Sequence, residues 1–67
     1  MINFEFLVTF DDEWDCFVAE IWHDNILLVE VTEHEEVRLY NEDKMKSVIE
    51  SIQFNDAIEY AKKRAKG

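Results

Sequence analysis

The sequence predicts an α+β fold in which a four-stranded antiparallel β-meander packs against a C-terminal α-helix. Apolar and polar residues alternate over residues 3–10, which is the two-residue period of a half-buried strand. Apolar runs flank the pair Asp24-Asn25, which is typical of a β-hairpin with a tight turn. Beyond residue 45 the apolar residues recur at helical spacing instead.

The first two predicted strands cover residues 3–10 and 16–23. The core face of the first carries Phe4, Phe6, Val8 and Phe10. The core face of the second carries Phe17, Ala19 and Ile21, and the opposite face carries Val18, Glu20 and Trp22. We expect residues 11–15 to form an acidic turn, because aspartate favours turns and crowded carboxylates require water.

The third and fourth predicted strands cover residues 26–33 and 37–41. In the third, the side chains expected to point inward are Leu27, Val29 and Val31, and those expected to point to water are Glu30 and Thr32. Residues 33–36 form a second acidic turn. In the fourth, Val37 and Leu39 face the core, while Arg38 and Tyr40 face outward. Such a meander commonly keeps one face exposed to solvent.

Two helical patterns follow the strands. Residues 45–52 have helical spacing, and Ser47 with Glu50 matches a capping box, but the same stretch is also compatible with an extended conformation. Residues 55–66 predict a helix that begins at the N-cap Asn55. Its apolar stripe consists of Phe54, Ala57, Ile58, Ala61 and Ala65. Its early acids and late bases complement the helix dipole.

Length and composition predict one small domain over residues 1–67. A chain of this size buries only about 60% of its unfolded surface, so its core is small. Cys16 is the single cysteine, so an internal disulfide is not possible. Nothing near the start resembles a signal segment, and no apolar run approaches the roughly 20 residues of a membrane span, so we expect a cytoplasmic protein.

The charge distribution predicts a basic protein partner. The chain has 16 acidic and 7 basic side chains, and the first base is Arg38. Four of the bases cluster at the end of the chain, at Lys62, Lys63, Arg64 and Lys66. A sheet rich in carboxylates would repel phosphates, which disfavours direct binding of nucleic acid.

Metal-binding and catalytic interpretations are less favoured. The acidic loop over residues 11–15 is too short for an EF-hand and lacks its glycine and distal glutamate, so a solvated turn is preferred. Cys16, His23 and His34 lack the close spacing of zinc ligands. We therefore expect no metal, no cofactor and no enzymatic activity.

Aromatic side chains among the charges predict a binding surface. Trp22 and Tyr40 are expected on the outward face of the sheet, and both residue types are enriched at binding hot spots. The alternative is that Trp22 covers the second face of the sheet or packs on residues 45–52. The predicted contact set is Asp11, Asp12, Asp15, Glu20, Trp22, Asp24, Glu30 and Tyr40.

The chain also resembles a family of small proteins. The segments WDCFVAEIWHDN, VEVTE, EVRLYNE and DAIEYAKKR, between Trp14 and Arg64, resemble the bacterial immunity-type proteins of toxin/immunity systems in pattern. The segment FNDAIEYAK looks like the helix of small antitoxins that resemble a degraded double-stranded RNA-binding fold. The Pro-Gly elements often seen in both groups are missing.

The resemblance implies a non-enzymatic inhibitor that covers the active site of a toxin, most often a nuclease with a basic cleft. A phage-encoded inhibitor of a host nucleic-acid-handling defence enzyme, such as an anti-CRISPR protein, belongs to the same physical class. A small structural or regulatory homodimer, paired through the sheet face or an edge strand, is the further alternative.

Overall fold

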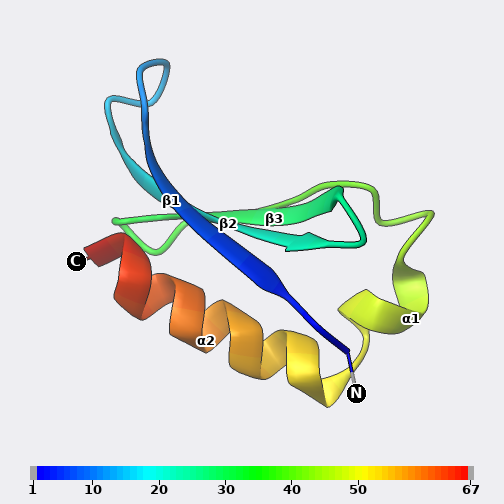
Figure 1. Ribbon diagram of the computed structural model, residues 1–67. Helices are drawn as coiled ribbons and strands as arrows, with labels where there is room; N and C mark the ends of the chain where they lie inside the picture. The colour runs from blue at the N-terminus through cyan, green and yellow to red at the C-terminus, as the bar shows by residue number, and fades with distance from the viewer. Residues whose placement is uncertain (1, 67) are drawn as a thin grey trace.

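The sheet is a four-stranded antiparallel meander, as predicted. The computed structural model describes residues 2–66. Its elements are β1 (Glu5–Asp11), β2 (Cys16–His23), β3 (Ile26–Thr32), β4 (Val37–Leu39), α1 (Lys46–Ile49) and α2 (Ile52–Lys66). The strands are hydrogen-bonded in the order β1-β2-β3-β4. The helix α2 lies across one face of the sheet, and no helix of the described chain lies over the other face (Figure 1).

The hairpin between β2 and β3 turns at Asp24 and Asn25, as the sequence predicts. Both residues have positive φ, 51° and 64°, which a type I′ turn requires. A β-bulge follows it: Ile21 pairs with Val29 and Trp22 with Leu27, which leaves Leu28 as the extra residue. The bulge corrects the predicted inward set, because Leu28 is fully buried in the core while Leu27 is only half-buried beside Trp22.

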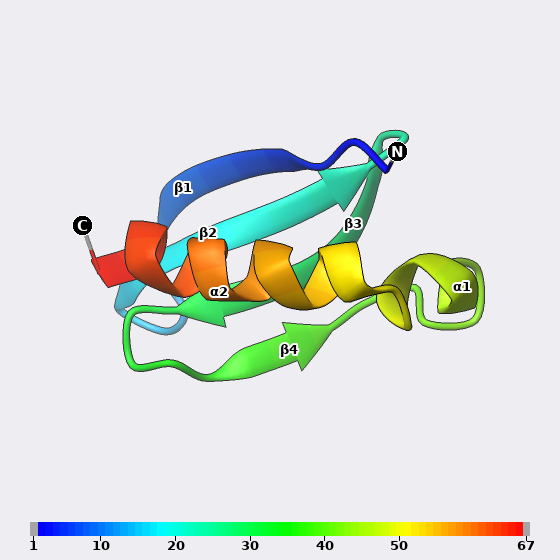
Figure 2. The same ribbon diagram turned by 90° about the horizontal axis from the view of Figure 1, so that it is seen from below.

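The core lies between α2 and the sheet. Its buried members are Ala19, Ile21, Leu28, Val29, Val31, Phe54, Ala57, Ala61 and Ala65. The three alanines bring the helix backbone close to β2 and β3, the strands that α2 crosses (Figure 2). In the described chain, no helix is both long and apolar enough to span a membrane.

The ends of the predicted core face are more exposed than expected. Phe10 and Phe17 pair with each other edge to face, with ring centroids 5.2 Å apart, and both are about half exposed. Val37 and Leu39 on β4 are 42% and 40% exposed. These positions lie beyond the reach of a single helix, so the alternation predicts their face correctly but not their burial.

The helices begin at different residues from those predicted. The short helix is a single turn, α1, and its N-cap Met45 makes no side-chain capping bond, so the Ser47 and Glu50 capping box is wrong. The long helix α2 starts at Ile52, three residues earlier than expected. The hydroxyl of Ser51 accepts a hydrogen bond from the backbone N–H of Phe54 at 3.2 Å, so Ser51 takes the capping role predicted for Asn55.

Candidate functional site

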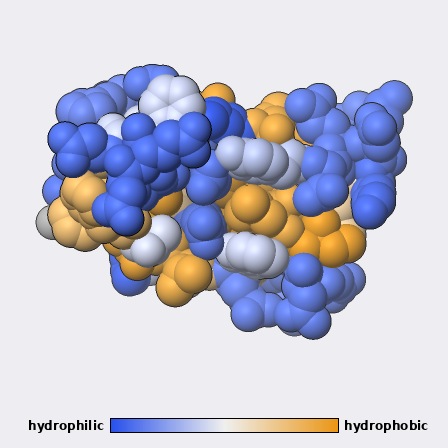
Figure 3. Space-filling model, turned by 90° about the horizontal axis from the view of Figure 1, so that it is seen from above, coloured by the Kyte–Doolittle hydropathy of each residue, from blue (hydrophilic) through white to orange (hydrophobic). Residues whose placement is uncertain are grey.

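The side of the sheet that faces away from α2, which we call the open face, is the candidate site. Strand register places three rows of side chains on it: Glu5 with Trp22 and Leu27; Leu7 with Glu20, Glu30 and Arg38; and Thr9 with Val18 and Thr32. Figure 3 looks onto this face, with apolar side chains gathered through its middle and hydrophilic ones at both ends. Leu7, in the middle of the three rows, is 54% exposed.

Glu30 is held in a polar network rather than exposed to water. It is only 8% exposed, and Arg38, directly opposite on β4, places Nη1 at 3.5 Å from Glu30 Oε1. The hydroxyl of Tyr40 donates a hydrogen bond to the same oxygen. The prediction that Glu30 and Thr32 point to water is therefore wrong. Arg38 on β4 and Tyr40, just after it, supply Glu30 with the partners that a buried carboxylate requires. Thr32 instead accepts hydrogen bonds from the backbone of the next turn.

Hydrogen bonding to Glu30 also changes the acidity of Tyr40. The bond to the carboxylate, followed by partial burial, raises the pKa of the Tyr40 phenol above its usual range. The guanidinium of Arg38 acts in the opposite direction and lowers it. The network therefore keeps this hydroxyl protonated as a donor.

Trp14 covers Arg38 from the β1–β2 turn. A side-chain oxygen of Asp11 accepts hydrogen bonds from the backbone N–H groups of Glu13 and Trp14, at 2.9 and 3.3 Å, and Asp15 has a φ of 53°. The turn thereby folds the indole back over the sheet, where the Arg38 guanidinium lies 3.7 Å from the ring centroid. The only signal for this contact in the sequence is a lone base that follows 37 residues without one.

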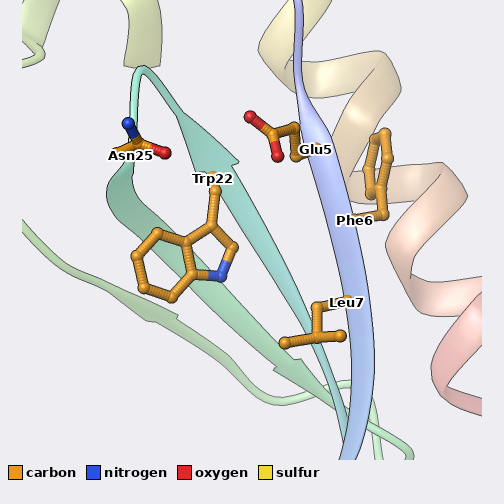
Figure 4. A pocket seen from close by; sticks show the side chains of 5 residues that line it. All are labelled: Glu5, Phe6, Leu7, Trp22 and Asn25. Atoms are coloured by element: carbon orange, nitrogen blue, oxygen red, sulfur yellow. The ribbon is translucent and has the colours of Figure 1, made fainter.

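Trp22 forms a second aromatic feature on the open face. Its indole Nε1–H donates a hydrogen bond to Glu20 Oε1 at 3.1 Å, which fixes the ring along β2. Beside it is a shallow groove of about 260 Å³ lined by Glu5, Phe6, Leu7, Trp22 and Asn25 (Figure 4). In this groove Glu5, Leu7 and Trp22 lie on the open face, while the Phe6 ring points towards α2.

The predicted contact residues form a strip along the molecule rather than one cluster. Glu20, Trp22 and Glu30 lie on the sheet itself, and Tyr40, just after β4, is hydrogen-bonded to Glu30. The three residues Asp11, Asp12 and Asp15 lie at one end of β2, and Asp24 lies at the other. The eight residues of β2 separate the two ends by roughly 25 Å, at about 3.3 Å per residue.

The basic end of α2 lies beside the turn between β3 and β4. Lys66 Nζ is 3.2 Å from a side-chain oxygen of Glu35. Arg64 and Lys66 line a hollow of about 330 Å³ together with Glu33 and Phe17. The terminal bases therefore neutralise part of this acidic turn from the helix side of the sheet and leave the carboxylates of the β1–β2 turn unaffected.

The cysteine and the two histidines do not form a site. Cys16 is buried at the start of β2, and burial, followed by the nearby Glu33 and Asp11, raises the pKa of its thiol. His23 lies at the opposite end of that strand, where Nδ1 is 2.7 Å from the backbone oxygen of Asn3. No group of three or more His, Cys, Asp or Glu residues within residues 2–66 is arranged to hold a metal ion.

Comparisons of the chain with protein-family models, with curated proteins and with solved structures found no match.

Proposed function

We propose that this chain is a non-enzymatic binding protein that neutralises a basic protein partner through the open face and its acidic turns. The observation that carries the proposal is the exposure of aromatic and apolar side chains on this face. No helix of the described chain covers it (Figure 1), and although the β1–β2 turn folds Trp14 over Arg38, Trp14 is still 50% exposed and Leu7 54% exposed. Tryptophan is enriched at binding hot spots, and here Trp14 is half exposed while Trp22 is part-buried.

The electrostatics of the face favour a basic partner. The turns at residues 11–15 and 33–36 carry seven carboxylates, four in the first and three in the second. The only base on the sheet, Arg38, is already engaged by Glu30 and Trp14. A field of one sign over a small surface accelerates the association of an oppositely charged protein and suppresses wrong partners.

The partner we propose is a toxin with a nuclease-type active site, which the chain would block as an immunity protein. A nuclease cleft is basic because it binds phosphates, so a carboxylate-rich surface is complementary to it. The resemblance in pattern to immunity-type proteins supports this setting. An inhibitor of a host nucleic-acid-handling defence enzyme, encoded by a phage, would use the same surface for the same physical reason.

A homodimer through the free edge of β1 is disfavoured by charge. Antiparallel pairing of two β1 strands centred on Val8 would place Glu5 of one copy opposite Asp11 of the other, and like charges in that position are destabilising. Sedimentation over a range of concentrations tests this alternative. A dimer that persists at low micromolar concentration would favour it over the proposed function.

The proposed function is tested by isolating the partner from lysate of the source cell at about 50 mM and about 500 mM salt. A variant with Asp12→Asn and Asp15→Asn removes two exposed carboxylates from the β1–β2 turn. The matched control, Glu50→Gln with Asp56→Asn, removes two exposed carboxylates from the helical side. Asn is compatible with the positive φ of Asp15.

We expect a basic partner whose retention falls at high salt and falls with the turn variant but not with the control. The proposal is refuted if the recovered protein is not basic. It is also refuted if the partner is retained equally at both salt concentrations and by both variants.

A further inference from the structure

The open face carries two sets of tryptophan and carboxylate side chains. In the first, Trp14 and Glu30 enclose a guanidinium: Arg38 lies 3.7 Å from the indole centroid and 3.5 Å from the carboxylate. The second set contains Trp22 with carboxylates from β1 and β2. Within residues 2–66, no salt bridge or cation–π contact joins a base to this second set.

The register of β1 and β2 builds the second set into a groove. Glu5 lies directly opposite Trp22, and Leu7 lies directly opposite Glu20. Cross-strand neighbours of this kind bring their side chains within about 5 Å at the Cβ atoms. The hydrogen bond from Trp22 to Glu20 holds the indole in place, so the groove has a fixed aromatic wall, an apolar wall and a carboxylate at its rim (Figure 4).

We infer that this groove binds one arginine side chain of the basic partner. The guanidinium would lie on the indole of Trp22 and pair with Glu5, while its methylene stem packs on Leu7. The volume of about 260 Å³ is below the roughly 300–1,000 Å³ of small-molecule pockets, which suits a single side chain. The inference rests on the proposed function, because it specifies how the basic partner is recognised.

Arginine is favoured over lysine for two reasons. A planar guanidinium both stacks on an aromatic ring and pairs with a carboxylate, whereas an ammonium group is more strongly hydrated and does not stack. The molecule already holds a guanidinium in this manner, between Trp14 and Glu30 on the same face. The groove at Trp22 supplies the same residue types without the base.

The test is an NMR titration with N-acetyl-arginine amide, followed at the two indole N–H resonances. Trp14→Phe and Trp22→Phe assign these resonances. We expect a saturable shift at Trp22, weaker binding of the lysine amide, and no saturable shift with the uncharged citrulline amide. Glu5→Gln should weaken binding by about fivefold, the effect of losing one exposed ion pair. The matched control Glu50→Gln, exposed on the helical side, should bind as the parent does.

The inference is overturned if the Trp22 resonance shows no saturable shift, or if Glu5→Gln and Glu50→Gln bind equally. Binding of the basic partner to the parent chain and to the groove variants then distinguishes this inference from the proposed function. If it binds the parent chain and the Glu5→Gln and Trp22→Phe variants with equal affinity, the groove is refuted and the proposed function stands. If arginine amide binds in the groove but no basic partner is recovered, the proposed function is refuted and the groove stands.

Discussion

Replacing Arg38 with methionine would leave Glu30 buried without its counter-charge. The side chains of Arg38 and Glu30 are 21% and 11% exposed, and the carboxylate lies directly opposite Glu20 on the neighbouring strand. Methionine keeps much of the length of the arginine stem but removes the guanidinium. The substitution therefore removes the charge of Arg38 while keeping most of the packing of its stem.

The cost follows from the geometry of the pair. At 3.5 Å and an effective dielectric constant of about 20, the attraction between Arg38 and Glu30 is about 5 kcal/mol before desolvation is subtracted. Removing one partner of a buried pair costs about 3–5 kcal/mol, and partial exposure reduces this to about 2–3 kcal/mol. Loss of the contact with Trp14 adds about 0.5–1 kcal/mol. The total is near 3 kcal/mol, a large share of the roughly 3–10 kcal/mol expected for a domain of 67 residues.

The assay is urea unfolding followed by far-ultraviolet circular dichroism. The matched control is Arg64→Met, because Arg64 is exposed and contacts Tyr60 through a hydrogen bond to its hydroxyl at 3.0 Å and a guanidinium 5.8 Å from its ring centroid. We expect this substitution to cost less than about 1 kcal/mol. The double variant Arg38→Met with Glu30→Gln also removes the unpaired carboxylate, so it should be about 1–2 kcal/mol more stable than Arg38→Met. The reasoning is refuted if Arg38→Met costs no more than Arg64→Met, or if the double variant is no more stable than Arg38→Met.

Three further predictions concern single residues. Ultraviolet titration, assigned with Tyr40→Phe, should show Tyr40 ionising above the usual pKa of about 10, and Glu30→Gln should lower that pKa. The stability from this hydrogen bond is present below pH ~10 and is lost as the pH rises through the higher pKa of the folded state. Cys16 should react with Ellman's reagent at least about 100-fold more slowly in the folded protein than in urea, because its thiol is buried and its pKa raised. Asn25→Ala should destabilise the hairpin by about 1 kcal/mol in urea unfolding, whereas Asn25→Gly, which tolerates the φ of 64°, should not.

Each of the three predictions would be contradicted by one specific result. If Tyr40 titrates at the ordinary tyrosine pKa, the bond to Glu30 does not hold its proton in solution. Equal thiol reactivity in folded and unfolded protein would show that Cys16 is accessible. If Asn25→Ala is as stable as Asn25→Gly, the turn does not require a positive φ at that position.

The strands and the hairpin are predictable because their signals are local. The alternation over residues 3–10 and the Asp24-Asn25 pair depend only on nearby residues. The bulge at Leu28 is not predictable in this way, since the run Ile26–Val29 is apolar throughout and is compatible with either register. The start of α2 is ambiguous in the sequence for a similar reason, because Ser51 and Asn55 are both good capping residues and the folded chain uses the first.

The candidate site was predicted less completely than the fold. The alternation placed Glu20 and Trp22 on the correct face. The burial of Glu30 depends on partners that β4 brings from residues 38 and 40, and the cover over Arg38 depends on a turn that folds Trp14 back across the sheet. These contacts join residues that are distant in the sequence, so a local sequence pattern does not predict them.

The placement of the single base on the sheet explains why the two halves of the open face differ. A chain of this length supplies one long helix, which covers one face, and the other face brings Glu20 and Glu30 directly opposite each other. Like charges in that position are destabilising unless partners are provided. The chain provides Arg38 for Glu30, so the charge of Glu30 is balanced internally in the half of the face under Trp14. On the other half, no salt bridge within residues 2–66 joins a base to Glu5 or Glu20. An arginine of the partner between Trp22 and Glu5 would complete there the arrangement that the chain completes for itself at Trp14.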